Sequence, residues 1–561
     1  MKARSFLTAL GATVLVLLFT VVGLWWTMAR NSPLRLADQS MELPRSAQFV
    51  PKQAALSLHW LMDPSRLPDY AQAVAPTRRR QDARDGIQAL RDGFFALAGF
   101  DFETELADWL GPHVSVALLD PDGASESPGW VLALSSRDDK GARRFLQRFW
   151  QSRSLAGMDL QISHYRGMGL ISGRGAFLGS DLQPLATALI DDDLLLLASG
   201  RGVLEQALDA SQFADQHQLG DPSLANSIAT LGDGIALLTA SPAALQTWFG
   251  LPARTQELDD LQGLVALLRP QGAQLGIEAQ LSFLNPRIDA GQDPHESLSI
   301  LNAARGPAEA LALLSKPSRF LDATNADPLV HWLSPHVKRL LFDSANSPEM
   351  ASGSALSDSS QKALLDKASA ASIVALDDGP LLWLQQPRGW LLGTFKDHPE
   401  LAAVDEALVH QGLARSELVS DGEDLAVWTR LERNGRSKEK LEAQLGLVMS
   451  EENDTVWWGQ NLTVMQQRQD AKSLDQRLVG LHALQDPSGE GLPNALSLAS
   501  QPARNLLRDW RPWELMQALA GYPLQSSVQS LSIAVGPDPD LGVDQDQKSS
   551  ALRLRAQFSF G

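Results

Sequence analysis

Every second residue is apolar in two stretches that lie far apart in the chain, residues 275–283 and 552–560. Successive side chains of a strand point to opposite faces, so a period of two is typical of a strand with one buried face. Apolar runs at 54–60, 114–119 and 130–135 also indicate strands.

Other stretches repeat their apolar residues at helical spacing. Ile87, Leu90, Phe94 and Leu97 fall on one face of a predicted helix, and residues 142–149 show the same pattern. A shorter helix is predicted over 101–110, because the following Gly-Pro pair is a standard stop signal.

Short polar turns join several of the predicted strands. Arg166-Gly167 separates a strand at 160–165 from one at 168–172, and the acidic turn Asp191–Asp193 follows a strand at 186–190. Turns of this kind connect neighbouring antiparallel strands. Hairpins interspersed with helices place the chain in the α+β class.

Much of the chain occurs twice. Trp130 returns as Trp390, at an offset of 260 residues, and residues 203–206 return as 464–467 at an offset of 261. The alternating strands at 275–283 and 552–560 end the two copies. The sequence therefore predicts two tandem related repeats of antiparallel hairpins and helices behind one N-terminal transmembrane helix.

The repeats are expected at 46–285 and 304–561, joined by a linker at 286–303. A Ser/Ala-rich stretch at about 344–370 has no counterpart in the first repeat and is predicted to be a mobile insertion. The preferred alignment pairs residues 374–377 with the strand before Asp120.

A second alignment stays open. Residues 332–337 resemble 109–114 at an offset of only 223.

The N-terminus contains a candidate membrane span. Residues 6–28 hold no charge, and about 20 apolar residues suffice to cross a bilayer. We expect a signal anchor at 1–30, followed by a tether at 31–45, with cleavage after Ala29 as the alternative. Lys2 and Arg4 favour a cytoplasmic N-terminus, which leaves the bulk of the chain extracytoplasmic, in a periplasm or lumen.

Composition excludes several classes of protein. The 561 residues carry a net charge of −18, whereas nucleic-acid binders need a dense basic face. The chain has no cysteine, so disulfides and thiolate-based sites are impossible. No nucleotide-binding motif follows a predicted strand. We expect no cofactor and no nucleic-acid or nucleotide partner.

Two segments fit the S-x-x-K pattern of penicillin-binding enzymes, residues 359–362 and 437–440. Neither has the companion motifs that such an enzyme needs, so both are interpreted as chance matches. No catalytic residue is assigned.

Metal binding also lacks a convincing motif. The acidic loop 537–548 holds Asp538, Asp540, Asp544 and Asp546 without the spacing of an EF-hand calcium site, and it is interpreted as a solvated loop. Asp191–Asp193 is interpreted as a turn. The ten histidines are scattered, and His331 and His336 do not share a helical face. No metal ligand is assigned.

The only basic cluster is Arg78-Arg79-Arg80 with Arg84. It is interpreted as a solvated helix start, with contact to anionic lipid head groups or an acidic partner as the alternative. Trp130 and Trp390 occupy matching places on matching strands and are expected to be core residues.

Several structural motifs resemble those of a family of uncharacterised, membrane-anchored bacterial proteins, mostly cyanobacterial, known as a domain of unknown function. These motifs are Val50-Pro51 before the first strand, Trp109-Leu110-Gly111 before residues 116–118, and the run 195–200 entering a helix. The resemblance implies no activity, cofactor or catalytic residue.

The sequence favours a non-enzymatic, membrane-tethered protein that binds or scaffolds a protein partner, with the lipid bilayer contacted through residues 6–28. The first alternative is a carrier or chaperone for a lipid or other apolar ligand. The second is a hydrolase whose site is not visible in the sequence.

Overall fold

The structure is a computed structural model, and it combines helices with one large antiparallel sheet, as the α+β class predicts. It describes residues 34, 36, 41–119, 129–155, 157–176, 182–249, 261–284, 294–317, 368–377, 379–396, 398–420, 422–433, 441–474, 494–508, 510–521, 523–537 and 550–560.

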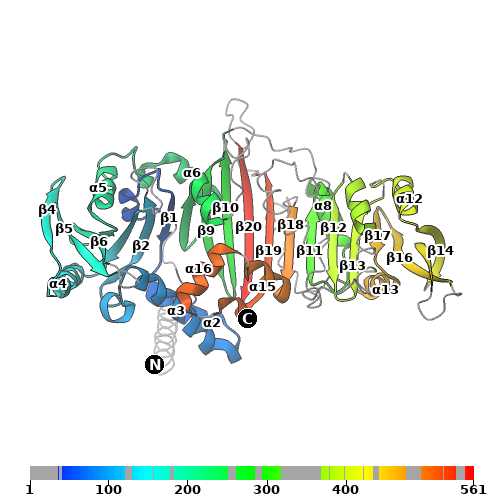
Figure 1. The fold of residues 1–561 in the computed structure, drawn as a ribbon, viewed down its shortest axis with the longest axis horizontal. Coiled ribbons are helices and arrows are strands. Elements are labelled where there is room, and N and C mark those ends of the chain that lie inside the picture. Colours follow the sequence, from blue (N-terminus) through cyan, green and yellow to red (C-terminus); the bar gives the residue numbers. More distant parts are fainter. Residues whose placement is uncertain are drawn as a thin grey trace, which may run out of the picture.

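Within the described residues the sheet has 20 strands, and every neighbouring pair of them is antiparallel (Figure 1). Ten strands belong to the first half of the chain: β1 (Leu56–Trp60), β2 (Leu110–Leu119), β3 (Gly129–Ser136), β4 (Gln161–Tyr165), β5 (Met168–Ala176), β6 (Leu182–Ile190), β7 (Leu194–Ala198), β8 (Ala236–Ala240), β9 (Leu261–Gln271) and β10 (Gln274–Phe283).

Ten more belong to the second half: β11 (Ala310–Leu314), β12 (Leu381–Gln386), β13 (Gly389–Phe395), β14 (Ala414–Ser420), β15 (Glu423–Arg433), β16 (Leu441–Glu452), β17 (Thr455–Gly459), β18 (Asn494–Ala499), β19 (Val528–Pro537) and β20 (Ser550–Phe560). From here on, the first half means β1–β10 with its helices, and the second half means β11–β20 with its helices.

The strand order is the same when it is read inward from either end of the sheet. The first half runs β4-β5-β6-β7-β3-β2-β1-β8-β9-β10. The second runs β14-β15-β16-β17-β13-β12-β11-β18-β19-β20. The last strand of each half therefore lies at the centre of the sheet.

The central pair, β10 and β20, has a symmetric register. Leu275 lies opposite Phe558, which is the counterpart of Leu281 in the second half. Leu281 in turn lies opposite Leu552, which is the counterpart of Leu275. Glu278 and Arg555 lie opposite each other at the middle of the pair, and the Arg555 Nε to Glu278 Oε2 distance is 3.0 Å. Pairing β10 with β20 leaves neither half with an open edge at the centre.

Helices cover both faces of the sheet. One face, which we call the α3 face, packs against α3 (Arg80–Leu97), α4 (Asp139–Leu155), α7 (Pro242–Phe249), α12 (Leu401–His410), α15 (Ser500–Arg508), α16 (Arg511–Ala520) and a helix over residues 368–376. The opposite face, the α5 face, packs against α5 (Arg201–Ala210), α6 (Pro222–Leu231), α8 (Pro294–Ala303) and α13 (Leu462–Asp470).

Short helical turns complete the fold: η1 (Arg45–Phe49), η2 (Pro64–Arg66), η3 (Thr77–Arg79), η4 (Phe102–Leu106), η5 (Gln218–Gly220) and η9 (Leu524–Ser527). The helix α2 (Leu67–Val74) lies against α3.

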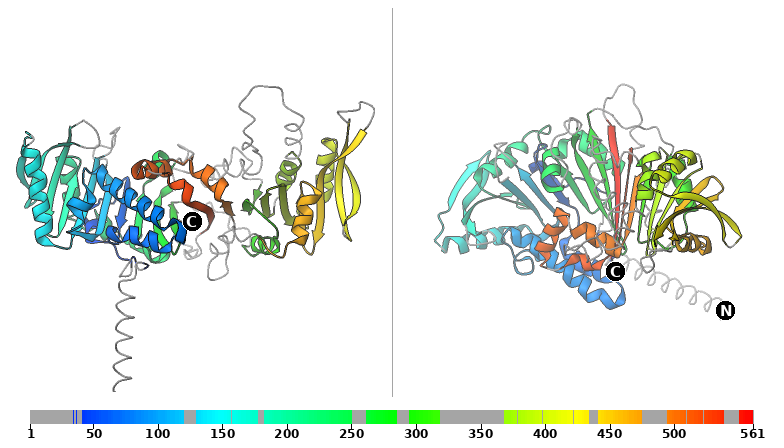
Figure 2. Two further views of the ribbon diagram at one scale, coloured as in Figure 1. Left: turned by 90° about the horizontal axis from the view of Figure 1, so that it is seen from below. Right: turned by 45° about the vertical axis from the view of Figure 1, so that its right-hand side comes forward.

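The two halves also meet through helices beneath the central strands. Figure 2 shows α16 beside α3, although they come from opposite ends of the chain. The approach is so close that a Cβ on Gly93 would lie 1.9 Å from the Leu519 carbonyl oxygen. Arg511 Nη1 donates to the Thr247 carbonyl oxygen at the end of α7, at 2.8 Å. These contacts add to the β10–β20 pairing.

Most of the predicted strands and hairpins are confirmed. The β4–β5 hairpin turns at Arg166 and Gly167, whose φ angles are 49° and 82°, and the β6–β7 hairpin turns through Asp191 and Asp192 at 47° and 64°. Two successive left-handed residues match the twist of the flanking strands. The alternating stretches at 275–283 and 552–560 lie in β10 and β20.

The helix predicted over 101–110 is wrong. Only Phe102–Leu106 is helical, with π-type hydrogen bonding, and β2 already begins at Leu110 and continues through the Gly-Pro pair. The register between β2 and β3 is irregular from Leu110 to Val114, where Ser135 Oγ bonds the backbone N–H of His113 at 3.0 Å. This side-chain bond replaces a regular ladder bond, so the strand tolerates a proline.

The predicted strand at residues 374–377 is also wrong, because residues 368–376 form a helix whose Ile373 and Val374 are buried on the α3 face. The neighbour of β11 is β12, which occupies the place of β2. The predicted linker 286–303 contains α8, which packs on β11, β12 and β13. The domain boundaries stay predictions.

The predicted membrane span at 6–28 lies outside the described residues, as do the acidic loop beyond Pro537 and residues 344–367 of the predicted insertion. No helix within the described ranges has the length and apolar character needed to cross a bilayer.

Candidate functional site

A buried polar cluster lies on the α5 face of β1. Ser57 and His59 are the second and fourth residues of this strand, and both are fully buried. The neighbouring strands contribute Ser115 from β2 and Thr239 from β8. Two short turns cover the cluster and contribute its last members, which are Ser46 from η1 and Gln218 from η5.

Hydrogen bonds connect all six side chains. His59 Nδ1 lies 2.8 Å from Ser115 Oγ, which lies 2.5 Å from Ser46 Oγ. His59 Nε2 lies 2.7 Å from Gln218 Oε1. Ser57 Oγ donates to the same Gln218 oxygen at 3.1 Å, and Gln218 Nε2 donates to Thr239 Oγ1 at 3.2 Å. Buried polar atoms need such partners, so the cluster is internally satisfied.

The neutral imidazole fits this network. His59 Nε2–H donates to the Gln218 oxygen, and Nδ1 accepts from the Ser115 hydroxyl. Burial lowers the pKa of His59 from 6.5 to about 4, and the bond to Gln218 opposes this shift in part. The imidazole is therefore uncharged at neutral pH.

A hydrogen-bonded Ser–His pair is also the core of a hydrolase site, but this cluster does not fit that chemistry. Ser115 and His59 are 1 % and 0 % exposed, so a substrate has no access to the hydroxyl. The group behind the imidazole is the amide of Gln218, which cannot stabilise an imidazolium as a carboxylate does. A pKa of about 4 also makes His59 a weak base at neutral pH.

The corresponding place in the second half is apolar. The second and fourth residues of β11 are Leu311 and Leu313, and Leu313 lies opposite Leu382 of β12. Helix α8 covers these leucines with Ile300 and Leu301. Ser497 and Ser532 form a polar pair there, with 2.8 Å between their hydroxyl oxygens. The two halves thus fill the same layer with different chemistry.

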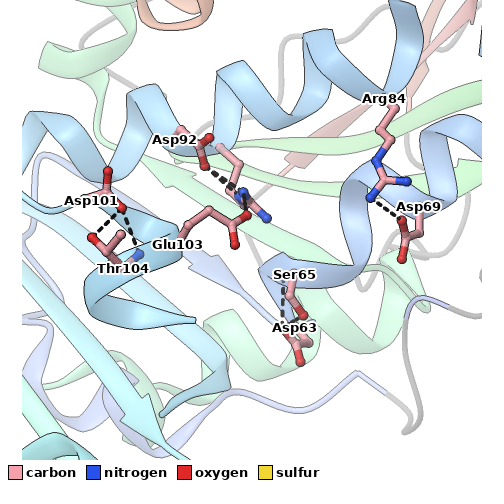
Figure 3. Close-up of polar contacts among 9 residues, drawn as sticks. Asp63, Ser65, Asp69, Arg84, Asp92, Asp101, Glu103 and Thr104 are labelled. Carbon is pink, nitrogen blue, oxygen red and sulfur yellow. Dashed lines mark hydrogen bonds and ion pairs between the residues drawn. The ribbon is translucent and has the colours of Figure 1, made fainter. Parts of the chain in front are cut away.

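A second polar group joins α3 to η4 (Figure 3). Arg91 of α3 is buried and bonds Asp92 at 2.8 Å and Glu103 at 2.5 Å, while its guanidinium lies 3.8 Å from the centre of the Phe102 ring. The turn itself is capped by Asp101, which accepts from the Thr104 backbone N–H at 2.8 Å. These contacts place Arg91 and Phe95 in the core, whereas Phe94 is only partly buried.

Asp191–Asp193 form the β6–β7 turn, as predicted, and they bind arginines. Arg45 pairs with Asp191 and Asp193, and Arg143 pairs with Asp192. No set of three or more acidic or histidine side chains within the described ranges is placed to hold a metal ion.

Trp390 is buried, as predicted, and stacks on Trp383 with 5.3 Å between ring centres. Trp130 is only partly buried. The backbones of the two tryptophans are held alike. The Trp130 carbonyl accepts from the Ser199 N–H at 3.0 Å, and the Trp390 carbonyl accepts from the Gln460 N–H at 3.1 Å.

Other residues considered in the sequence lie outside the described residues. These are both S-x-x-K segments, His331 and His336, and the aspartates from Asp538 to Asp546.

The two outermost strands of the sheet present open edges. Within the described residues, β4 pairs only with β5 and β14 pairs only with β15. Apolar side chains are exposed on both strands, with Ile162 78 % and Val419 69 % exposed. An unpaired strand offers a row of backbone donors and acceptors to another chain.

A shallow hollow lies between the helix at 368–376 and strands β15 and β16. Its space of about 310 Å³ merges with the solvent, and its lining mixes polar with apolar groups: Ser369, Gln411, Leu413, Arg430, Gln444, Leu445 and Gly446. A shallow hollow that is open to solvent does not match the enclosed apolar cavity of a lipid carrier.

Comparison with known proteins gives a family but no activity. Residues 9–554 match the family described as "Protein of unknown function (DUF3352)". No curated protein matches the chain. Among solved structures, TP0453 in crystal form I is similar at 10 % identity and a TM-score of 0.25, covering 44 % of this chain and 82 % of that one. Crystal form III gives 12 % identity, a TM-score of 0.27, and coverage of 46 % and 86 %.

Proposed function

Because the chain belongs to the DUF3352 family of proteins of unknown function, we propose a role from its own structure: it binds or scaffolds another protein while tethered to a membrane. The observation that carries this proposal is the pair of open sheet edges. Both β4 and β14 expose backbone and apolar side chains at the two ends of one continuous sheet.

Strand addition is the binding mode that these edges favour. An extended segment of a partner gains affinity from main-chain hydrogen bonds and specificity from alternate side chains. β14 is exposed on both faces over six of its seven residues, so a partner segment has access to it from either side. The partner class is therefore a protein with an extended, partly apolar segment.

The location of the protein is part of the same proposal. We place residues 6–28 in a membrane as a single signal anchor, with the N-terminus in the cytoplasm and the bulk outside it, because these 23 residues hold no charge. The sheet then lies in the compartment where a partner is scaffolded.

We also propose that the two halves are copies of one unit. The shared strand order, the symmetric β10–β20 register and the matching backbone bonds of Trp130 and Trp390 support this. Duplication gives the sheet two equivalent ends, so one molecule presents two edges of the same kind.

Photo-crosslinking tests the binding proposal. A photoreactive amino acid at position 162 or 419 of the full chain, expressed in its host, should give a discrete adduct. The matched control carries the same group at Leu155, which is 89 % exposed but lies on α4. Val419→Lys beside a probe at Leu418 should abolish the adduct, because a charge on an edge strand opposes strand addition.

Adducts that are identical at positions 155 and 419, or absent at both edges, would refute binding through the edges. Release of the full chain from membranes by a carbonate wash would refute the membrane tether, but it would leave the proposal of binding through the sheet edges unaffected.

A further inference from the structure

Three arginines are exposed where the pair α2–α3 turns. Arg78 and Arg79 end the turn η3, and Arg80 begins α3, with all three exposed. Arg84 does not belong to this surface. Its guanidinium bonds Gln72 at 3.1 Å and lies 3.4 Å from Asp69 of α2 (Figure 3). The basic tip, defined as Arg78–Arg80, is a cationic site on a chain of net charge −18.

Near the start of the described chain, Leu36 packs against α2, the helix that leads to this tip. Leu36 is 6 % exposed and packs with Met62 and Ile235. Leu67 and Tyr70 of α2 lie against the same group. The polypeptide that leads to the proposed anchor is therefore attached to the body of the protein at α2.

Chain length then limits how far the basic tip can be from the bilayer. Leu36 comes eight residues after Met28, the end of the uncharged stretch, and a fully extended chain spans about 28 Å over that length. The end of α2 after Tyr70 and the segment that leads from Val74 to Arg78 add at most about 20 Å to this distance. The tip lies within reach of the membrane surface.

We propose that the basic tip binds anionic lipid head groups and so orients the tethered sheet relative to the membrane. This inference rests on the proposed anchor. A juxtamembrane arginine near an anionic surface strengthens association roughly fivefold, so three give about a hundredfold effect on the ratio of docked to undocked molecules. Asp82, in the first turn of α3, opposes part of this attraction.

The absence of cysteine makes a clean experiment possible. Thr77→Cys is labelled with a fluorescent donor in the full chain and reconstituted into vesicles that carry a head-group acceptor. One set of vesicles is phosphatidylcholine, and the other is an equal mixture of phosphatidylcholine and phosphatidylglycerol. Energy transfer should be higher in the anionic vesicles and should fall with added salt, because salt screens the attraction. A label at Ser416→Cys on β14 should show no such difference.

Two triple variants separate charge from other contacts. Replacing Arg78, Arg79 and Arg80 by Glu should abolish the dependence on anionic lipid. Replacing them by Lys should keep it, because the attraction requires only the charge. Equal transfer in the two kinds of vesicle for the parent chain would overturn the proposal.

Loss of the lipid dependence in the Lys variant would also overturn it, in favour of a partner that reads guanidinium groups. A carbonate wash of the same vesicles reports on the anchor alone. If the chain stays in the pellet but energy transfer does not depend on the lipid, binding of the basic tip to anionic lipid is refuted and the membrane tether is not.

Discussion

In the first half, the second and fourth residues of β1 are Ser57 and His59, and in the second half the same places in β11 hold Leu311 and Leu313. Both sites lie on the α5 face between equivalent neighbouring strands. The first is covered by two short turns and the second by α8. One architecture therefore accepts either a hydrogen-bonded network or packed aliphatic side chains.

The difference shows what each solution requires. Leucines need only shape and volume, so α8 covers them with the aliphatic side chains of Ile300 and Leu301. The network needs every partner, because a buried polar group without a hydrogen bond destabilises the fold by more than one satisfied hydrogen bond stabilises it. At this layer of the sheet, the first half is thus the one that is sensitive to single polar changes and to protonation.

The largest effect should come from moving the histidine to the wrong half. Leu313→His would bury an imidazole among Leu382, Ala495 and α8, in a layer that is mainly aliphatic. We expect a loss of about 5 kcal/mol in the free energy of unfolding, from the unpaired polar group and the lost packing. Denaturant unfolding followed by tryptophan fluorescence measures it, with Leu313→Ile as the control. A loss below about 1 kcal/mol would show that the layer in the second half admits water.

Acid should weaken the first half through His59. The pKa of His59 is lower in the folded protein, about 4, than its ordinary value of 6.5, so the unfolded chain binds the proton more readily. The contribution is fully present above pH 6.5 and is lost as the pH falls toward 4, by about 3 kcal/mol. Burial also lowers the pKa values of His113 and His217, which act in the same direction.

The matched control for acid sensitivity is a six-residue apolar variant: Ser46→Ala, Ser57→Ala, His59→Leu, Ser115→Ala, Gln218→Leu and Thr239→Val. Subtracting its pH profile removes the carboxylates and the other histidines. A difference profile that is flat between pH 6.5 and 4 would contradict the assignment to His59.

A single broken partner should cost more than removal of the whole network. Gln218→Leu leaves His59 Nε2–H without its acceptor, and we expect a loss of about 2 kcal/mol. The six-residue apolar variant should lie within about 1.5 kcal/mol of the parent chain, because it leaves no unpaired group. Thermal melts of both variants decide this. A six-residue variant much less stable than Gln218→Leu would mean that the network itself stabilises the fold.

The smallest effect should come from the surface pairs above the cluster. Arg45 begins η1 and pairs with Asp191 and Asp193, but its side chain is 45 % exposed. Such pairs contribute about 0.5 kcal/mol, so Arg45→Ala should change the melting temperature only slightly. Arg143→Ala, which breaks the pair with Asp192 in the same turn, is the matched comparison. A large loss of stability for Arg45→Ala alone would show that the surface ion pairs, and not the hydrogen bond of Ser46, hold η1 in place.

The sheet was largely predictable from the sequence because its strands carry local signals. Alternation marks β10 and β20, and turn residues such as Arg166-Gly167 mark the hairpins. Where a longer-range contact decides the structure, prediction failed. Gly-Pro after Leu110 indicated the end of a helix, but a bond from Ser135 keeps the segment in β2.

The polar cluster was not predictable in the same way. Alternation within β1 assigns Ser57 and His59 to a polar face, which for an isolated strand means solvent. The partner of His59 is Gln218, 159 residues away on a three-residue turn. No pattern in the sequence links these two residues, so burial of the polar face became visible only in the structure.

The central pairing of Glu278 with Arg555 is possible in one chain that holds both halves, but not in a dimer of identical subunits. At the middle of a symmetric register, each residue faces its own counterpart, so two identical subunits would place like with like there. Glutamate against glutamate or arginine against arginine is repulsive, whereas one chain that encodes both halves can place opposite charges 3.0 Å apart. Each half therefore disfavours a second copy of itself and accepts the other. Under the proposed duplication, covalent fusion freed the halves to diverge separately, a freedom that a dimer of identical chains lacks.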